Sequence, residues 1–410
     1  MEILGKIILY IIMACCGIGA VATVVKEDSG LARSFHDGLH AMALLFLPIV
    51  GLMVSVPYLV VGVENIFGSL FRSIGADPAV AAAMLVPPDC GGYALFLALA
   101  RSPEIVVIAL AVAIMTASTV AFNIPVGLSV LKKEDHPYMA LGAMSGFLAI
   151  PFGVFFTCLL LVLTKPAIRT SFSTTAASDY ILNMQLGTVL INLLPITVFC
   201  VLLALGLKFF PRGMIRGFMI FGKIVLSVLT LIAAGSIIEY YTGVFTLLFG
   251  SWGFDPVMAD GVESFRAIEL LGSIAMMLTG AFPMVYLLRK FLGKGLARIG
   301  RLAGLDETGS AGILATMANG VALFNMIKDM TPTNKVLCIA FTVCGGYCLG
   351  DWIAFNANFQ PNLVVPFFLG QLFGGVVGIV FAKLIAIPQV RKMNAATEAA
   401  PPPTAEVPAE

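Results

Sequence analysis

Two aspartates, Asp89 and Asp351, lie inside otherwise apolar stretches of the sequence, "PPDCGGYALF" and "CLGDWIAFNAN". A carboxylate at the centre of a membrane-spanning helix costs about 2.5–3.5 kcal/mol on insertion scales, so it tends to be kept only where it has a partner or a task. Two acids near one depth suit a cation, because a carboxylate binds an ammonium group through a charge-assisted hydrogen bond. We therefore expect these two carboxylates to bind a small cationic solute.

Other polar and aromatic side chains accompany the two acids. An Asn amide can hydrogen-bond a substrate hydroxyl, and the face of an aromatic ring can bind a cation. Phe96 and Tyr347 are further aromatic residues that flank the acids. Structural roles stay open: Asp89 could cap a following helix, Asp351 could pair with a polar group on a neighbouring helix, and the asparagines could join helices. The candidate substrate-binding residues are Asp89, Asp351, Asn319, Asn123, Asn356, Trp352 and Tyr93.

The elements that hold these residues are apolar segments long enough to cross a membrane. Of the 410 residues, 59% are hydrophobic and 11% are charged, and the mean hydropathy is +1.00. A span needs about 20 apolar residues. We predict an all-α polytopic protein of the lipid bilayer, with full-length segments near residues 3–25, 39–62, 104–131, 138–164, 187–210, 216–240, 264–289, 335–358 and 363–388.

Two shorter segments, near residues 79–100 and 309–328, are interrupted. Proline removes a backbone donor, and glycine lets the chain leave helical geometry. Broken backbone at membrane depth is tolerated where it is buried in protein or lines a wet cavity. We predict that both segments are broken helices that act as gates, either re-entrant or fully spanning. The candidate gate residues are Pro88, Gly91, Gly92 and Gly320.

The two broken segments align with each other. The run "GADPAVAAAMLVPPDCGGYALF" from Gly75 matches "GLDETGSAGILATMANGVALF" from Gly304, and further along "VAFNIP" matches "IAFNAN". This alignment places Asp351 opposite Ser118. Because the matching features keep the same order, we predict two structural repeats, as in many transporters.

The predicted domain order follows from this alignment. Residues 1–165 form the first transmembrane repeat, and residues 216–388 form the second. Residues 166–215 are a linking segment that contains one extra helix, residues 187–210. Residues 389–410 are rich in Pro and Ala and are predicted to be a disordered cytoplasmic tail.

The distribution of basic residues predicts how the two repeats face. Residues 289–301 contain five Lys and Arg, whereas residues 241–265 contain none, so the first segment should be cytoplasmic and the second external. If both broken segments are re-entrant, nine crossings result and the repeats are inverted. If both cross fully, the repeats are parallel.

Several classes of function are not expected. The eight cysteines lie in apolar segments without metal-type spacing, so we expect no metal site and no cofactor. The net charge of +1 and the lack of a basic, aromatic-rich domain argue against nucleic-acid binding. No cluster suited to catalysis accompanies the two acids, so we expect no enzyme. The oligomeric state, including a homo-oligomer, stays open.

Four stretches, "PDCGGYALF", "ANGVALF", "RAIELLGSIAMMLTGAFPMVYLL" and "CLGDWIAFNAN", resemble the ethanolamine permeases, the EutH family of bacterial ethanolamine-utilization operons. The resemblance covers about residues 1–388. It implies a multi-pass protein of the bacterial cytoplasmic (inner) membrane that imports ethanolamine. Carried over by motif, it directs attention to Asp89, Gly91, Gly92, Asn319 and Asp351.

The chemistry of ethanolamine agrees with the two acids, since this small primary amine is mostly protonated at neutral pH. We therefore predict a permease that imports ethanolamine by alternating access around carboxylates near the membrane midplane. A Na⁺- or H⁺-coupled transporter of another small solute, such as a nucleoside or an amino acid, would use the same architecture and is the alternative. A channel would be distinguished by the lack of saturation.

Overall fold

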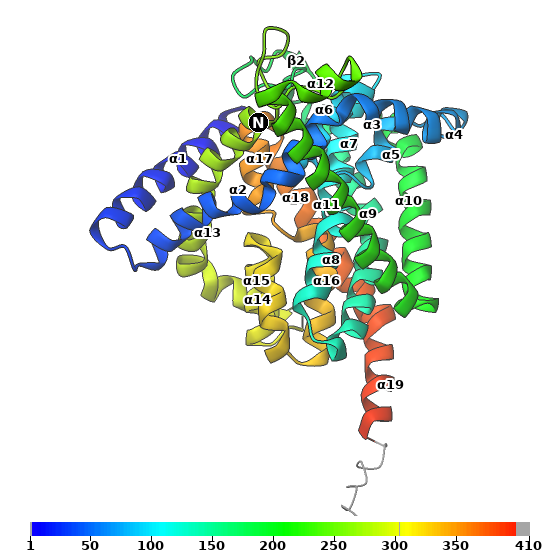
Figure 1. The fold of residues 1–410 in the computed structure, drawn as a ribbon. Coiled ribbons are helices and arrows are strands. Elements are labelled where there is room, and N and C mark those ends of the chain that lie inside the picture. The colour runs from blue at the N-terminus through cyan, green and yellow to red at the C-terminus, as the bar shows by residue number, and fades with distance from the viewer. Residues whose placement is uncertain (1, 303, 399–410) are drawn as a thin grey trace, which may run out of the picture.

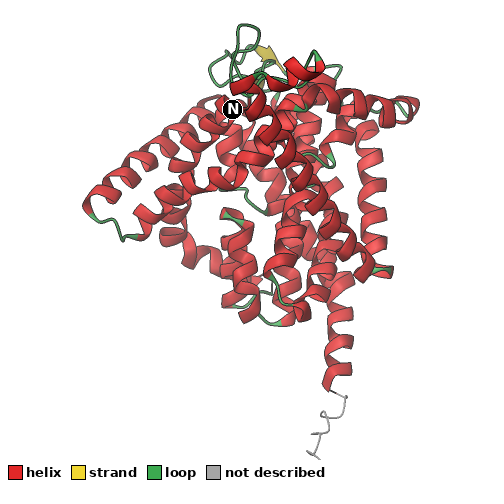
Figure 2. Ribbon diagram, viewed as in Figure 1, coloured by secondary structure: helices red, strands yellow, loops and turns green. Residues whose placement is uncertain are grey.

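The computed structural model describes residues 2–302 and 304–398. Helices make up most of this part of the chain, as Figure 2 shows. Eight helical stretches in the described residues are long and apolar enough to cross a membrane: Ile3–Val25, Gly30–Val54, Pro103–Val130, Lys133–Thr164, Leu186–Phe209, Pro211–Thr242, Ala267–Phe291 and Pro361–Ala395. The prediction of an all-α polytopic membrane protein is confirmed.

The chain begins with two long helices, α1 (Glu2–Val25) and α2 (Gly30–Val54). Helix α2 starts earlier than the expected segment 39–62, because Ser29 caps it by accepting a hydrogen bond from the Ala32 amide at 3.1 Å. Polar residues can extend a helix from such a cap without adding to its apolar run. A short continuation follows after Ser55, formed by α3 (Val56–Val63), the π-helical turn η1 (Glu64–Gly68) and α4 (Ser69–Ser73).

The first interrupted segment is broken, as predicted. Helix α5 (Pro78–Ala83), the 3₁₀ turn η2 (Pro88–Cys90) and helix α6 (Gly92–Leu99) replace what could have been one helix. The next span consists of α7 (Pro103–Met115), the π-helical turn η3 (Ser118–Asn123) and α8 (Ile124–Val130). The 3₁₀ turn η4 (Lys133–Asp135) then leads into the long helix α9 (His136–Thr164).

The middle of the chain starts with two short antiparallel strands, β1 (Ala167–Ile168) and β2 (Tyr180–Ile181), in which Ala167 pairs with Ile181. The linking helix, predicted over residues 187–210, is α10 (Leu186–Phe209). It is followed by α11 (Pro211–Thr242), α12 (Val244–Phe249) and α13 (Ala267–Leu302).

The second interrupted segment is also broken. One residue, Asn319, separates α14 (Glu307–Ala318) from α15 (Gly320–Met326), and the 3₁₀ turn η5 (Ile327–Asp329) follows. The chain closes with η6 (Pro361–Leu363), α18 (Val364–Phe381), the π-helical turn η7 (Ala382–Ala386) and α19 (Ile387–Glu398). Helix α19 thus runs past residue 388. Residues 399–410 lie outside the described residues, so the disordered tail stays a prediction.

The expectation of one continuous helix over residues 335–358 was wrong. The structure has α16 (Pro332–Gly345) and α17 (Asp351–Phe359), with a non-helical stretch between them. Helix α16 ends where Gly346 turns to an extended conformation, and Tyr347, which follows, has a left-handed φ of +59°. The freed backbone donors bond elsewhere: the Tyr347 amide donates to Thr316 O at 2.8 Å, and the Leu349 amide donates to Met317 O at 2.9 Å. The break therefore packs onto the end of α14.

The two broken segments begin in the same way. Gly75 and Gly304, which the alignment pairs, have left-handed φ angles of +77° and +76°. Two residues later, Asp77 caps α5 by accepting from the Ala79 amide, and Asp306 caps α14 by accepting from the Gly309 amide. This local agreement fits the predicted alignment; the orientation of the two halves is a separate question.

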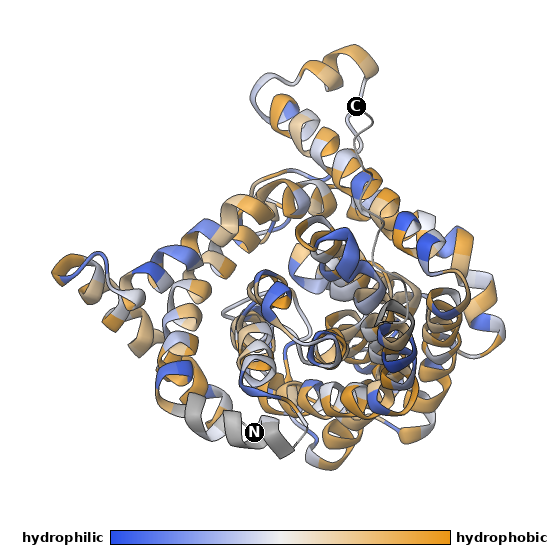
Figure 3. Ribbon diagram, turned by 90° about the horizontal axis from the view of Figure 1, so that it is seen from below, coloured by the Kyte–Doolittle hydropathy of each residue, from blue (hydrophilic) through white to orange (hydrophobic). Residues whose placement is uncertain are grey.

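The arrangement in Figure 1 separates the two broken segments: α5 and α6 lie in the upper half of the view, and α14 and α15 lie in the lower half. Helices α9, α16 and α18 pack against one another. Apolar residues cover much of the peripheral helices in Figure 3. Leu202 of α10 and Leu231 of α11, for example, are 62% and 73% exposed, as expected for surfaces that face hydrocarbon.

Candidate functional site

Asp89 lies in the turn that interrupts the first broken segment. Pro87 is extended, Pro88 begins the 3₁₀ turn, and Gly91 adopts a left-handed φ of +97° before α6 starts. Helix α6 has no side-chain cap, so Asp89 does not have the capping role that its position allowed. Its Oδ1 atom is fully buried and has no hydrogen-bond partner among the residues described. This oxygen is available to a ligand.

Asp351 is the first residue of α17 rather than the middle of a long helix. A carboxylate in the first turn of a helix is stabilised by the positive end of the helix dipole. The backbone at Gly350 lies very close to the end of α14: a Cβ added to Gly350 would clash with Ala318 O. No ion pair joins Asp351 to a basic side chain within residues 2–302 and 304–398.

The two acids are brought into one neighbourhood. Tyr93, four residues after Asp89, and Phe355, four residues after Asp351, pack with their ring centroids 5.8 Å apart, and the Trp352 amide donates to Tyr347 O at 3.2 Å. Two like charges repel, and this repulsion is strong away from water. A cation between them would offset it.

Tyr347 and Asn123 approach the second break from different parts of the chain. A Cβ at Gly320 would stand 2.5 Å from Tyr347 Oη and 2.8 Å from Asn123 Oδ1. Both atoms are buried and lack a hydrogen-bond partner in the part of the chain that the structure describes. Gly320, predicted as a gate residue, is thus the residue whose missing side chain lets these two groups meet. Tyr347 was predicted only as a flanking ring, because nothing in its sequence context indicates the left-handed backbone.

Asn356 and Trp352 lie on α17 beside Asp351. The Asn356 Nδ2 atom donates to Trp352 O at 2.8 Å, while Asn356 Oδ1 and Trp352 Nε1 are buried without a described partner. Leaving a buried polar atom unpaired costs about 1–3 kcal/mol. Such atoms gathered in one region indicate a place that receives water or a polar ligand.

Two predicted residues have structural partners instead. The side-chain oxygen of Asn319 caps α15 by accepting from the Val321 amide at 2.8 Å. Tyr93 is 1% exposed, and its hydroxyl accepts from Gln360 Nε2 at 2.6 Å. Its ring packs against Phe355 and Phe172, with centroids 5.8 and 5.6 Å apart. Tyr93 therefore belongs to an aromatic cluster that joins α6 to α17.

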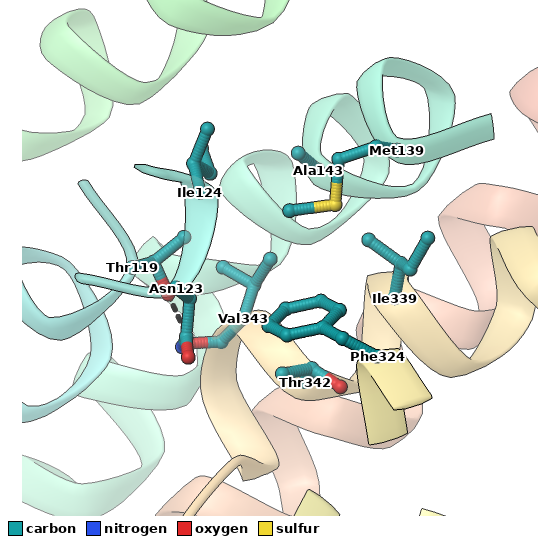
Figure 4. A pocket seen from close by; sticks show the side chains of 9 residues that line it. All are labelled: Thr119, Asn123, Ile124, Met139, Ala143, Phe324, Ile339, Thr342 and Val343. Atoms are coloured by element: carbon teal, nitrogen blue, oxygen red, sulfur yellow. Dashed lines mark hydrogen bonds between the residues drawn. The ribbon is translucent and has the colours of Figure 1, made fainter. Parts of the chain in front are cut away.

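A small cavity lies next to Asn123, between the π-helical turn η3 and helices α15 and α16. Figure 4 shows Asn123 and Thr119 on one side, with Phe324 and Val343 opposite them. The Thr119 hydroxyl donates to Val343 O at 3.1 Å. The cavity volume is about 10 Å³, which is room for one water molecule. The described residues contain no group of His, Cys, Asp and Glu side chains that could hold a metal ion.

Comparison with known proteins gives one consistent result. Residues 4–385 match the family described as "Ethanolamine utilisation protein, EutH". The chain is 34% identical to the "Probable ethanolamine permease EutH" of Listeria monocytogenes, over 97% of this chain and 98% of that protein. It is 31% identical to the protein of the same name from Escherichia coli K12, again over 97% and 98%. An uncharacterized Bacillus subtilis protein, YxeR, is 30% identical over 94% of this chain and 96% of its own. No solved structure matches significantly.

These matches and the apolar helices agree on a multi-pass protein of the bacterial inner membrane. Its relatives are named as permeases, which transport and do not catalyse. The resemblance carried by "PDCGGYALF" and "CLGDWIAFNAN" therefore extends over nearly the whole sequence, and the chain belongs to the EutH family.

Proposed function

We propose that this protein imports ethanolamine across the bacterial inner membrane, and that Asp89 and Asp351 together bind its ammonium group. The observation that carries this proposal is the packing of α6, which follows Asp89, against α17, which begins at Asp351: the rings of Tyr93 and Phe355 lie 5.8 Å apart. The names of the relatives support the choice of substrate. The buried Asp89 Oδ1 supports the choice of atoms.

A protonated amine is the ligand that this charge arrangement favours. Two carboxylates that share a partly buried region repel each other, and an ammonium group placed near both relieves that repulsion. Each carboxylate can also accept a charge-assisted hydrogen bond from the three N–H donors of the ammonium group. A neutral solute would not relieve the repulsion between the two carboxylates.

The two halves of the chain form inverted repeats in this proposal, with the N-terminus outside and the C-terminus inside. There are nine crossings, one of which α16 and α17 make together. The paired helix starts after Gly75 and Gly304 support the repeat. The positions of the broken segments in opposite halves of Figure 1 support the inversion. Each repeat also interrupts the span after its broken segment: η3 begins at Ser118, and α17 begins at the aligned Asp351. π-Helical turns of this kind occur frequently at functional sites.

Alternating access requires the broken segments to move. The cavity beside Asn123 holds about one water molecule, and ethanolamine is several times larger. The substrate therefore enters only when a broken segment shifts, and α5–α6 and α14–α15 serve as the two gates. Their short helices and glycine-containing breaks suit such a motion, because few backbone hydrogen bonds must be exchanged.

Uptake of labelled ethanolamine by cells that express the protein tests this function. Asp89→Asn and Asp351→Asn keep the side-chain size and remove the charge, so each should lower uptake by about 10- to 100-fold, the loss expected for one charge-assisted hydrogen bond. Asp329→Asn is the matched control, because Asp329 is exposed in η5. Membrane levels of all variants must be equal. Unchanged uptake in both site variants would refute the proposed site.

Competition by unlabelled solutes separates ethanolamine from the alternative substrates. Excess ethanolamine should block uptake of the label, whereas serine and uridine should not. If uridine or an amino acid competed better, the protein would be a transporter of that solute with the same architecture. Saturation of uptake in vesicles distinguishes a transporter from a channel.

A further inference from the structure

Ethanolamine carries a hydroxyl group as well as an ammonium group, and two polar side chains near the acids are suited to the hydroxyl. We propose that Tyr347 and Asn123 bind the substrate hydroxyl and thereby set the preference for an amino alcohol over a simple amine. This inference rests on the proposed function and adds a specificity-determining pair to it.

The geometry brings the two groups to a single point. Tyr347 Oη and Asn123 Oδ1 lie 2.5 Å and 2.8 Å from the position that a Cβ at Gly320 would take. They do not bond to each other, and neither has another hydrogen-bond partner among the described residues. Both residues are well over nine-tenths buried, with exposures of 5% and 3%. Their polar atoms therefore lie close together in a water-poor region at the second break.

The chemistry of the pair matches a hydroxyl group. A phenol can donate a hydrogen bond, and an amide oxygen can only accept one. A substrate hydroxyl does both at once: its oxygen accepts from Tyr347, and its O–H donates to Asn123. An amine without the hydroxyl, such as ethylamine, would leave both protein groups unpaired. Sites built to hydrogen-bond a hydroxyl reject analogues that lack it for this reason.

The Tyr347–Asn123 pair lies close enough to the two acids for one substrate molecule to reach both. The amides of Gly350 and Trp352, on either side of Asp351, donate to Tyr347 O at 3.0 and 3.2 Å, so the pair lies near the proposed ammonium site. Ethanolamine separates its two polar groups by two carbon atoms only. One molecule can therefore reach the acids with its ammonium group and the Tyr347–Asn123 pair with its hydroxyl.

The backbone holds Tyr347 in place at some cost. Its left-handed φ of +59° is uncommon for a bulky residue. Two hydrogen bonds to the end of α14, from the amides of Tyr347 and Leu349, fix this conformation. Unfavourable backbone conformations of this kind persist where the surroundings impose them, and they cluster at ligand sites. The same bonds attach the backbone of Tyr347 to the end of α14, which belongs to the gate formed by α14 and α15.

Equilibrium binding to the purified full chain tests the inference, with ethanolamine and ethylamine compared on each variant. The wild type should bind ethanolamine at least about tenfold more tightly than ethylamine. Tyr347→Phe and Asn123→Leu should each reduce this preference by about five- to tenfold, by weakening ethanolamine binding while ethylamine binding is retained. Because both groups bind one hydroxyl, the double variant should lose less than the sum of the two single losses.

Tyr138→Phe is the matched control. It also removes a phenolic hydroxyl, one that bonds to Asn394 at 3.4 Å near the start of α9, and it should leave the preference unchanged. Retained ethylamine binding shows that each site variant is folded. A preference for ethanolamine that survives in both Tyr347→Phe and Asn123→Leu would overturn this inference and leave the proposed function standing. A wild type that binds neither amine would refute the proposed function, and with it this inference.

Discussion

Replacing Gly91 by alanine tests how the turn that carries Asp89 is built. Gly91 has a φ of +97°, and an added Cβ would lie 2.9 Å from Met53 Cγ and 3.1 Å from Leu52 Cδ2. The left-handed conformation costs a residue with a Cβ about 1–2 kcal/mol. Displacing the ends of two flexible side chains adds about 1 kcal/mol, the low end of the range for overpacking. We expect Gly91→Ala to lower the free energy of unfolding by about 2–3 kcal/mol and to reduce ethanolamine uptake, because Asp89 shifts.

Two further glycines separate the backbone cost from the cost of the clash. Gly243 has a φ of +61° and nothing within 4 Å of its Cβ position, so Gly243→Ala should show the backbone cost without the clash. Gly62 lies inside α3 with open space around it, and Gly62→Ala should be neutral or stabilising by about 0.5–1 kcal/mol. Neither should change uptake.

Thermal unfolding of the purified protein, followed by the reaction of its cysteines with a thiol dye, measures the order of stability. The eight cysteines are free, and most are buried, so they react when the fold opens. The expected order is Gly62→Ala, then Gly243→Ala, then Gly91→Ala as the least stable. A Gly91→Ala protein as stable and as active as Gly62→Ala would refute the reasoning about this turn.

Two other predictions concern charged groups away from the site. The Lys335 ammonium and the Asp135 carboxylate form a 2.5 Å ion pair, in which the two side chains are 12% and 2% exposed. Asp135→Asn should destabilise the protein by about 3–5 kcal/mol, because it leaves the buried Lys335 charge unpaired. The double variant with Lys335→Met should recover most of this loss in the same thermal assay, and an equal loss in the single and double variants would contradict the prediction. The amides of Glu263 and Val262, followed by Arg266, hold the pKa of Asp260 below its ordinary value. Its stabilising contribution is therefore present at neutral pH and is lost as the pH falls through that lowered pKa. Asp260→Asn should speed hydrogen exchange at Val262 and Glu263 at pH 7, and the difference from the wild type should shrink in acid; a pH-independent difference would argue against the charge.

Much of the fold was readable from the sequence, because hydrocarbon imposes simple rules on helices. Long apolar runs predicted the spans, and Pro88 with Gly91 and Gly92 predicted the first break. The second interrupted segment, residues 309–328, was recognised in the same way, and its alignment with the first followed. Each of these features depends on one local property: the length of the apolar run decides a span, and the backbone freedom of Pro and Gly decides a break.

The break between α16 and α17 was not predicted, because its cause is tertiary. The stretch from Gly345 to Gly350 is as apolar as a continuous helix would be, and its glycines alone did not distinguish it from a packing surface. The amides of Tyr347 and Leu349 bond to α14, and that contact becomes visible only in the folded chain.

Only part of the candidate site could be predicted from the sequence, because tertiary contacts decide the partners of its other residues. A charge in an apolar run is conspicuous, so Asp89 and Asp351 could be selected by residue type. The partners of a tyrosine or an asparagine depend on neighbours distant in sequence. Tyr93 and Asn319 have structural bonds, whereas Asn123 and Tyr347 meet at Gly320.

The central claim is that carboxylates from the two halves of the chain form one cation site. Equilibrium binding of labelled ethanolamine to the purified protein tests it without dependence on gating or energy coupling. We predict that Asp89→Asn and Asp351→Asn each weaken binding by about 10- to 100-fold, and that the effects of the two changes are not additive in the double variant. Binding as tight as that of the wild type in both single variants would contradict the account.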